Sequence, residues 1–314
     1  MLFAALRQVR IWGVITGIVL WAGCGLGQIG VPGDSSEANT NSSGISSSDD
    51  AAFSDAGTMG TGTTDTGQGS SPGNDPNDPC GNAWFCDDFE NASSGGAPDS
   101  PWQSELVQST ISIDSAQSYS GSQSVHVKTS SNQSYTRGLI RFEDNAVLPV
   151  AGNHFFARAM MYIKAVPDAY VHWTLVEAAG PVENENFSAR YRFGGQNYKR
   201  FLANYWTEPT NVANTDCWQH SDDMIVEGQW QCFEWEFDGP NNREQMWVNG
   251  QAVNNMNVQD HGQGCLSNDL GGQWLAPQFT TLSIGWGHYQ QSNMSHELWI
   301  DDVVISGQAI GCPE

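Results

Sequence analysis

Four basic residues fall within eleven consecutive positions of this 314-residue chain, at Arg190, Arg192, Lys199 and Arg200. The whole sequence holds only 12 Lys and Arg against 35 Asp and Glu, so its formal net charge is −23 at pH 7. Arginine suits a carboxylate because its guanidinium presents a planar fork of donors. The cluster therefore predicts a binding site for an anionic ligand. The alternative is that it pairs with nearby acids such as Glu183 and Glu185.

Three consecutive strand-like segments, at 170–177, 188–193 and 200–206, place part of this cluster on one face. Successive side chains of a strand point to opposite faces, so the apolar positions define the side that faces the core. The residues assigned to the core are Val171, Trp173, Leu175, Tyr191, Phe193, Phe201, Ala203 and Tyr205. The opposite face then carries Tyr170, His172, Thr174, Arg190, Arg192, Arg200, Leu202, Asn204 and Trp206.

The chemistry that fits these residue types is β-elimination on a uronic acid polymer. That reaction needs a neutralised carboxylate, a base for the C5 proton and an acid at the leaving oxygen. His172 is the candidate base or carboxylate neutraliser, and Arg190, Arg192 and Asn204 would hold the carboxylate. Tyr289 would give or take the proton. The alternative for His172 is a hydrogen-bonded structural role in its strand.

Aromatic residues favour a sugar ligand in a general way, because flat rings stack on pyranose rings. The chain has 13 tryptophans, and most of them are expected in the core. Trp206, Trp286 and Tyr289 are the candidates for exposed platforms. The predicted substrate-binding residues are Gln196, Lys199, Trp206, Trp286 and Gln290.

Glycoside hydrolysis is the alternative chemistry, because it uses two carboxylates roughly 5–10 Å apart. Glu234 and Glu236 lie on one face of a predicted strand, but at a spacing of two residues. The Asp-Gly-Pro turn that follows indicates an outer sheet face. We therefore rank hydrolysis below elimination.

Two acidic strands are predicted to meet at the ends of the folded part. Asp301 and Asp302 lie within the apolar segment 297–306, and the segment 84–90 is similarly acidic. Alternation would turn the two aspartates to opposite faces, which excludes an acid/base pair. The inward carboxylate needs a cation or several hydrogen bonds. A metal ion or a salt link is therefore expected there.

Residues 80–314 contain many short alternating segments and no convincing amphipathic helix, which predicts an all-β, two-sheet antiparallel sandwich of the jelly-roll, concanavalin A-like type. The expected strands are 84–90, 110–114, 124–129, 138–142, 154–164, 170–178, 188–194, 200–206, 231–238, 244–249, 280–285 and 297–306.

The first 79 residues are read as export and linker segments. Residues 1–23 combine Arg7 and Arg10 with a short apolar stretch, which is typical of a secretory signal. Trp-Ala-Gly-Cys resembles a lipobox, so Cys24 is predicted to be lipidated; an ordinary secretory signal is the alternative. Residues 24–79 are rich in Ser, Gly and Thr and predict a disordered linker. We expect an exported protein, either secreted or a lipoprotein of the bacterial cell envelope.

Removal of the signal would change the net charge from −23 to −25, because it carries two arginines and no acids. Such a charge argues against nucleic acid as a partner and against any membrane contact except the lipid anchor. The expected partner is an anionic polysaccharide, and the expected state is a monomer. Six of the seven cysteines remain for disulfides, with 15 possible pairings. The chain has no C-x-x-C motif, so the cysteine spacing does not suggest a zinc site.

Several short motifs together resemble one protein family. They are Phe85-Cys-Asp-Asp-Phe-Glu90, Ser120-Gly-Ser-Gln-Ser124, Gly194-Gly-Gln196, the segment 228–239, Gly285-Trp286, Trp299-Ile-Asp-Asp302 and Ile310-Gly-Cys312. The family is the polysaccharide-lyase-like jelly-roll family of the cellulose-induced secreted fungal protein and its bacterial relatives, which is similar to glucuronan and alginate lyases. The alginate-lyase signatures are not present, so the resemblance favours glucuronan-like substrates over alginate.

The resemblance also implies one structural calcium ion. Asp301 would be its side-chain ligand, and main-chain oxygens near Glu90 and in the loop from Tyr119 to Gly121 would complete the site, since calcium takes oxygen ligands. Cys312 would be tied back towards Cys80 or Cys86. Three functions stay open: a polysaccharide lyase, a non-catalytic carbohydrate-binding lipoprotein, and a structural surface protein whose basic cluster pairs with its own acids.

Overall fold

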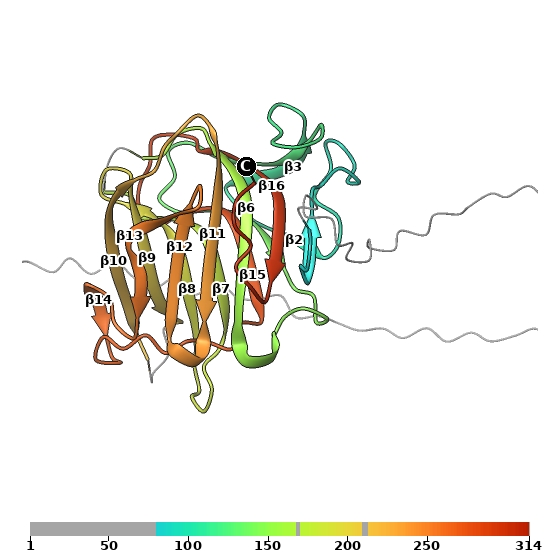
Figure 1. The fold of residues 1–314 in the computed structure, drawn as a ribbon. Helices are drawn as coiled ribbons and strands as arrows, with labels where there is room; N and C mark the ends of the chain where they lie inside the picture. The colour runs from blue at the N-terminus through green and yellow to red at the C-terminus, as the bar shows by residue number, and fades with distance from the viewer. Residues whose placement is uncertain (1–79, 168–169, 209–212, 314) are drawn as a thin grey trace, which may run out of the picture. The chain divides into compact units, whose positions relative to one another are not determined.

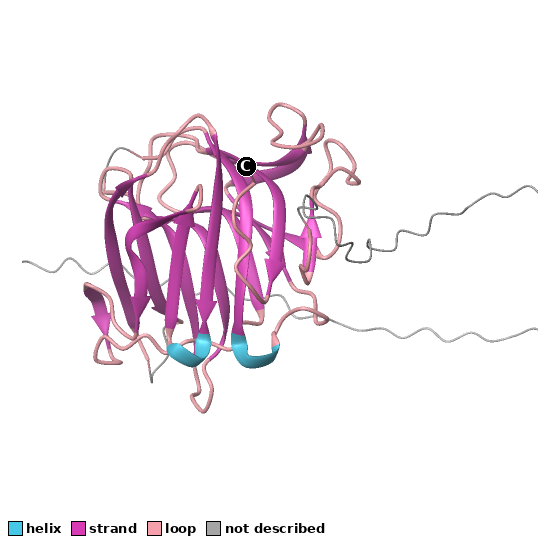
Figure 2. Ribbon diagram, in the orientation of Figure 1, coloured by secondary structure: helices cyan, strands magenta, loops and turns pink. Residues whose placement is uncertain are grey.

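The computed structural model describes residues 80–167, 170–208 and 213–313. These residues form sixteen strands and two single-turn 3-10 segments, η1 (Ala151–Asn153) and η2 (Gly239–Asn241). Figure 2 shows that strands and loops make up nearly all of the described part. The predicted all-β class is confirmed.

The strands form two antiparallel sheets that lie in separate layers (Figure 1). The first sheet has the order β13 (Gln251–Gln259), β12 (Arg243–Val248), β11 (Trp230–Asp238), β6 (His154–Ile163), β16 (Glu297–Ser306), β4 (Ser124–Thr129) and β3 (Ser109–Asp114), with β1 (Phe85–Asp87) paired to β16. The second has the order β14 (Gly264–Asn268), β10 (Thr215–Met224), β9 (Arg200–Thr207), β8 (Ser188–Gln196), β7 (Trp173–Pro181), β15 (Thr281–His288), β5 (Thr136–Phe142) and β2 (Trp102–Val107).

Aromatic side chains fill the space between the sheets. Phe193 of β8 stacks on Phe237 of β11 with ring centroids 5.7 Å apart, which ties one sheet to the other. The core-facing residues predicted for the segments at 170–206 all belong to this cluster. Alternation in these strands therefore identified the buried side correctly.

The first and last strands meet as predicted, since Phe85 of β1 pairs with Ile305 of β16. Four strands were missed: β2, β10, β13 and β14. Three of them, β2, β13 and β14, are sheet edges, where exposure on both faces weakens the alternating pattern. The fourth, β10, is rich in polar residues because its outward face carries side chains such as Asp216 and His220.

All six cysteines of the described residues form disulfides, in the pairs Cys80–Cys86, Cys217–Cys265 and Cys232–Cys312. The prediction that Cys312 is tied back towards Cys80 or Cys86 is wrong. The chain after β16 crosses β11, where Glu234 accepts the amides of Ile310 and Gly311 at 2.7 and 3.2 Å. This path brings Cys312 to Cys232. Disulfides are typical of proteins outside the reducing cytoplasm.

The predictions for residues 1–23, for the linker 24–79 and for lipidation at Cys24 lie outside the described residues. No helix within the described part is long and apolar enough to cross a membrane.

Candidate functional site

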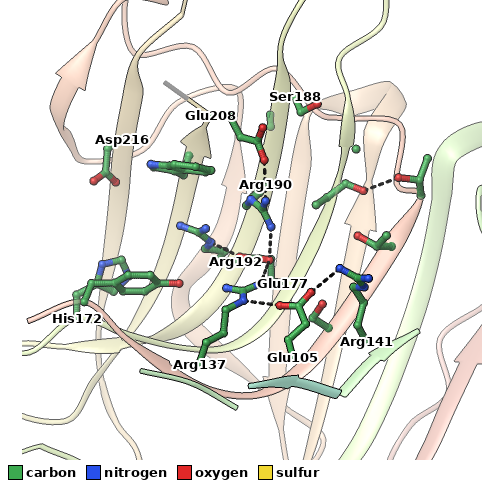
Figure 3. A pocket seen from close by; sticks show the side chains of 18 of the residues that line it. Glu105, Arg137, Arg141, His172, Glu177, Ser188, Arg190, Arg192, Glu208 and Asp216 are labelled. Carbon is green, nitrogen blue, oxygen red and sulfur yellow. Dashed lines mark hydrogen bonds and ion pairs between the residues drawn. The ribbon is translucent and has the colours of Figure 1, made fainter. Parts of the chain in front are cut away.

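The outward face of the second sheet is hollowed into a cleft of about 740 Å³. Side chains from seven strands, β2, β5, β7, β8, β9, β10 and β15, line it. Figure 3 shows its charged residues converging from both sides. They are Glu105, Arg137, Arg141, Glu177, Arg190, Arg192, Glu208 and Asp216. The predicted residues His172, Trp206, Tyr289 and Gln290 line the same cleft.

Glu177 lies at the centre of the charged group (Figure 3). It accepts hydrogen bonds from Arg190 Nη1 at 2.5 Å, Arg192 Nε at 2.6 Å and Arg137 Nη2 at 2.7 Å. Its side chain is only 1% exposed. Burial disfavours its ionised form, but the charges of Arg192, Arg137 and Arg190 outweigh burial and hold the pKa of Glu177 well below its usual range. Glu177 is therefore a carboxylate at any physiological pH.

Sequence reasoning missed Glu177 because β7 is irregular. Strict alternation would turn Glu177 to the same side as Trp173 and Leu175. The pairing of β7 with β8 shifts register between Thr174 and Val176, so Leu175 and Val176 are both buried in the core. Before this bulge the even-numbered positions of β7 face outward, and after it the odd-numbered positions do. Glu177 therefore faces the cleft.

A second carboxylate extends the network towards the sheet edge. Glu105 of β2 pairs with both Arg137 and Arg141 of β5, with 2.8 Å between Arg141 Nη1 and Glu105 Oε1. On the other side, Arg190 Nη2 lies 2.8 Å from Glu208 Oε1. The spacing of four between Arg137 and Arg141 was a usable signal, since it places both on one face of a strand.

Arg192 connects the network to the predicted polar residues. Its Nη1 donates to Asn204 Oδ1 at 3.3 Å, and Asn204 Nδ2 donates to Asp216 Oδ1 at 2.8 Å. Its guanidinium carbon lies 5.0 Å from the centre of the Trp206 ring and 5.4 Å from that of Tyr289. Of the predicted group, Arg192, Trp206 and Tyr289 thus line the cleft together, while Asn204 is buried outside the lining and contacts Arg192.

His172 lies immediately before β7, next to Tyr289. Their ring centroids are 4.9 Å apart, and the amide of Tyr289 donates to the His172 carbonyl at 3.0 Å. The Tyr289 hydroxyl is 3.2 Å from the Thr174 hydroxyl. Burial, together with the charges of Arg192 and His220, lowers the pKa of His172 to about 3. The imidazole is therefore neutral near pH 7.

Other predicted substrate-binding residues have different surroundings. Trp286 is fully buried and stacks on Trp173 with centroids 4.7 Å apart, so its prediction as an exposed platform is wrong. Trp286 alternates along β15 with the core residues Leu282 and Ile284, so its side chain points to the same, buried face. Gln290 lines the cleft and accepts the amide of His172. Lys199 and Gln196 are outside the cleft lining.

The acids that pair with the basic cluster are not the ones expected. Arg190 and Arg192 bind Glu177, Lys199 Nζ lies 2.7 Å from Glu227, and Arg200 Nη1 lies 3.0 Å from Asp222. Glu183 and Glu185 are exposed and make none of these ion pairs. The basic cluster is thus split, because Arg190 and Arg192 line the cleft and Lys199 and Arg200 do not.

The alternative carboxylate pair has structural partners on the first sheet. Glu234 accepts the amides of Ile310 and Gly311. Glu236 lies 2.8 Å from His154 Nε2 and 2.7 Å from Arg243 Nη2. Neither glutamate lines the cleft.

The predicted calcium residues gather around one loop. Asp301 Oδ2 accepts the amides of Tyr119 and Ser120 at 2.8 and 3.3 Å, and the Ser120 hydroxyl donates to Asp302 at 2.7 Å. Both aspartates thus reach the same residue, so the prediction that they point to opposite faces is wrong. The reason is a bulge, because β16 shifts register against β6 between Asp301 and Val304.

Glu90 approaches the same loop from the other end. Its carboxylate accepts the amides of Ser122 and Gln123 at 2.9 and 3.0 Å, and a Cβ on Gly121 would fall 2.3 Å from its carboxyl carbon. Burial raises the pKa of Asp301 to about 7, although the backbone amides of Tyr119, Ser120 and Asp302 donate to its carboxylate. The three carboxyl groups around this loop can supply the negative charge that a bound cation requires. The main-chain carbonyl of Glu90 accepts a hydrogen bond from the side-chain Nε2 of Gln123.

A family model described as polysaccharide lyase-like, Cip1-like core domain, matches residues 91–308. The chain belongs to this family. The resemblance read from the sequence motifs is therefore confirmed. The match covers every strand except β1 and includes every residue that lines the cleft.

Among solved structures, the fold is similar to that of the cellulose induced protein Cip1, with 20% identity and a TM-score of 0.52 over 73% of this chain and 100% of that one. At that identity the likeness shows the fold. Weaker matches include an endo-β-1,4-glucuronan lyase from the fungus Trichoderma reesei, with 10% identity and a TM-score of 0.45 over 72% and 96% of the two chains. Another is an endo-1,3-β-glucanase from Streptomyces sioyaensis, with 12% identity and a TM-score of 0.44 over 71% and 95%. A comparison with curated proteins found no match.

Proposed function

We propose that this member of the Cip1-like family is an extracytoplasmic polysaccharide lyase that cleaves a uronate-containing polymer by β-elimination. The substrate class is glucuronan-like, and the cleft on the second sheet is the active site. The observation that carries the proposal is the convergence in one cleft of a neutral histidine, a tyrosine and arginines: His172 lies 4.9 Å from Tyr289, and Arg192 lies 5.4 Å from the same ring.

Arg192 is the residue proposed to bind the substrate carboxylate. Its Nε and Nη1 are used by Glu177 and Asn204, and no described residue accepts a hydrogen bond from its Nη2. A donor on a cation is thus left for a uronate, and charge-assisted hydrogen bonds of this kind acidify the C5 proton. Glu177, Arg190 and Asn204 fix the orientation of Arg192.

His172 and Tyr289 are proposed to move the protons. His172, as a neutral imidazole, takes the C5 proton, and the Tyr289 hydroxyl donates to the leaving glycosidic oxygen. The C5–H electron pair forms the new C4–C5 double bond as the C4–O bond breaks, so no water and no oxidant is consumed. Trp206 and Gln290, at the cleft wall, would contact the sugar rings.

Incubation of the protein with glucuronan, alginate and pectate tests this function. The unsaturated product absorbs near 235 nm, a chromophore that hydrolysis does not make. We expect absorbance to rise with glucuronan and more slowly or not at all with alginate. No rise with any of the three polymers, across several pH values and with calcium present, would contradict the lyase proposal.

A second candidate function is carbohydrate binding without turnover. It is favoured by the ion pairs of the cleft, since Arg190 and Arg192 already share Glu177 and a substrate carboxylate must compete for what remains. Retention of glucuronan in affinity electrophoresis, with no absorbance change, would support this function over the lyase.

We also propose that the loop from Tyr119 to Gly121 binds a structural calcium ion. What supports it is the gathering of Asp301, Asp302 and Glu90 around this loop, because hard oxygen ligands with excess negative charge suit calcium. Asp301 would be the side-chain ligand, with main-chain oxygens of Glu90, Tyr119 and Gly121. The ion would fasten β16 to the segment after β1 and has no part in the proposed reaction.

A further inference from the structure

A neutral polar cluster lies on the second sheet outside the cleft lining. His220 Nε2 is 3.2 Å from Gln196 Oε1 and 3.0 Å from Asn197 Nδ2, and His220 Nδ1 is 3.2 Å from Gln263 Oε1. Burial lowers the pKa of His220, so the ring is uncharged near pH 7. Amides and a neutral imidazole offer both donors and acceptors. Sugar hydroxyl groups are ligands of the same kind.

Two exposed tyrosines connect this cluster to the cleft. Tyr170 and Tyr198 are 66% and 49% exposed, and their rings meet edge to face with centroids 5.1 Å apart. Tyr198 directly follows Gln196 and Asn197, while Tyr170 precedes the cleft residue His172 by two positions. The contact between the two rings therefore brings the segment that carries His172 against the segment that carries Gln196 and Asn197.

The turn that carries Tyr198 has an unusual backbone. Asn197, Tyr198 and Lys199 have φ values of 51°, 63° and 72°, a left-handed conformation that L-residues other than glycine rarely adopt. The Ile225 amide donates to the Lys199 carbonyl at 2.8 Å, and Lys199 Nζ lies 2.7 Å from Glu227. Strained backbone that its surroundings hold in place is common at ligand sites. Here the strain presents Tyr198 beside Tyr170.

The chemistry of this surface differs from that of the cleft. The cleft offers arginines, which suit a carboxylate. The neighbouring surface offers amides, an uncharged ring and aromatic faces, and the cations at its margin are paired, Lys199 with Glu227 and Arg200 with Asp222. Such a surface suits an uncharged sugar.

We propose that Tyr170, Tyr198, Gln196, Asn197, His220 and Gln263 form a second carbohydrate subsite, which binds an uncharged sugar unit of the same chain whose uronate occupies the cleft. The inference rests on the proposed function for the identity of the cleft's ligand. Along β8, Gln196 is four residues from Arg192, or about 14 Å at ~3.4 Å per residue, so the subsite lies a few sugar units away. The preferred substrate is then a heteropolymer that contains uronate and neutral units.

Kinetics on two polymers test the subsite. Gellan, in which glucose and rhamnose accompany each glucuronate, should be the better substrate, and glucuronan, which has uronate units only, the poorer. The double variant Tyr170→Ala/Tyr198→Ala should raise KM for gellan about tenfold, as expected when aromatic stacking is lost, with kcat and the KM for glucuronan unchanged. A matched control is Trp84→Ala, which removes an aromatic residue that is 46% exposed and precedes β1. Equal KM values for wild type and double variant on gellan would overturn the subsite.

A binding measurement separates failure of the subsite from failure of the lyase. Cellohexaose is uncharged and is not a lyase substrate, so its titration by calorimetry reports on the subsite alone. We expect wild type and Trp84→Ala to bind it equally and the double variant to bind about tenfold more weakly. Protein that binds cellohexaose in this way but turns over no uronan contradicts the proposed lyase and supports the subsite. Absent binding, or equal binding by the double variant, overturns the subsite.

Discussion

Two buried glutamates on opposite sheets have opposite electrostatic surroundings. Glu177 of β7 is 1% exposed and is held by three arginines, which keep the pKa of its carboxyl below the usual range. Glu244 of β12 is fully buried in the core. Neither of its carboxyl oxygens has a hydrogen-bond partner among the described residues, and burial raises its pKa well above the usual range. The arginines favour the ionised form of Glu177, and burial favours the protonated form of Glu244.

The difference between the two glutamates indicates which face of the protein keeps ionised side chains available to a ligand. Ionised groups are maintained on the cleft face, where each guanidinium that touches Glu177 also contacts a second side chain: Arg190 contacts Glu208, Arg192 contacts Asn204 and Arg137 contacts Glu105. The core beside Glu244 is aromatic, with Tyr191 nearby. A charged ligand therefore has a complementary surface at the cleft.

Removal of Glu177 should have the largest effect on stability. Glu177→Ala leaves Arg137, Arg190 and Arg192 without their shared counter-charge, and loss of one partner of a buried ion pair costs about 3–5 kcal/mol. Urea denaturation measures the free energy of unfolding. The control is Glu208→Ala, since Glu208 is 51% exposed and an exposed pair contributes about 0–1 kcal/mol. Equal losses for the two variants would contradict the central place given to Glu177.

Replacement of Glu244 should have the opposite sign. Glu244→Met keeps the length of the side chain and removes both unpartnered oxygens, so we expect stability at pH 7 to be unchanged or to rise by about 1–4 kcal/mol. Glu183→Gln, at an exposed position, is the control and should change little. Destabilisation by Glu244→Met would show that the carboxyl group has a partner that supports the fold.

The pH dependence distinguishes the two glutamates further. Because the pKa of Glu244 is raised in the folded protein, its contribution to stability is fully present below the unfolded value near 4.5 and is lost as the pH rises. Because the pKa of Glu177 is lowered, its contribution is present above that value and is lost as the pH falls. Between pH 5 and pH 9, Glu244→Met should therefore lose less stability than wild type, by about 1.4 kcal/mol per pH unit below the folded pKa of Glu244. Parallel curves would argue against a neutral Glu244.

Asp301 is a third buried carboxylate. Within the described residues, its hydrogen-bond donors are all backbone amides. If calcium binds at this loop, chelation should lower the melting temperature of wild type by several degrees, as a loss of ligand stabilisation requires. Asp301→Asn should melt lower than wild type and should not respond to the chelator. A wild-type melting temperature that chelation leaves unchanged would exclude the structural ion.

The fold was predictable because, in a regular strand, the alternation of apolar and polar residues identifies the buried face. In β8 and β9 every second residue is apolar, and Tyr191, Phe193, Phe201 and Ala203 are buried as alternation requires. The bulges were not predictable. They reverse parity within β7 and β16, which turns Glu177 into the cleft and brings Asp302 beside Asp301, and no residue type in those strands marks the shift.

The cleft was predicted in part. His172, Arg192, Asn204 and Tyr289 come together as expected, whereas Glu105 comes from an edge strand that the sequence pattern did not reveal. Trp286 shows the converse error, because its alternation with Ile284 was available and indicates a core position.

The most direct test of the account is the activity of His172→Ala on glucuronan, measured at 235 nm together with the melting temperature. His261→Ala is the matched control, because His261 is exposed and lies outside the cleft lining. We predict that His172→Ala lowers kcat at least 100-fold, the scale of general base catalysis, while its melting temperature stays near that of wild type. The control should retain full activity. Substantial turnover by a folded His172→Ala protein would contradict the proposed mechanism.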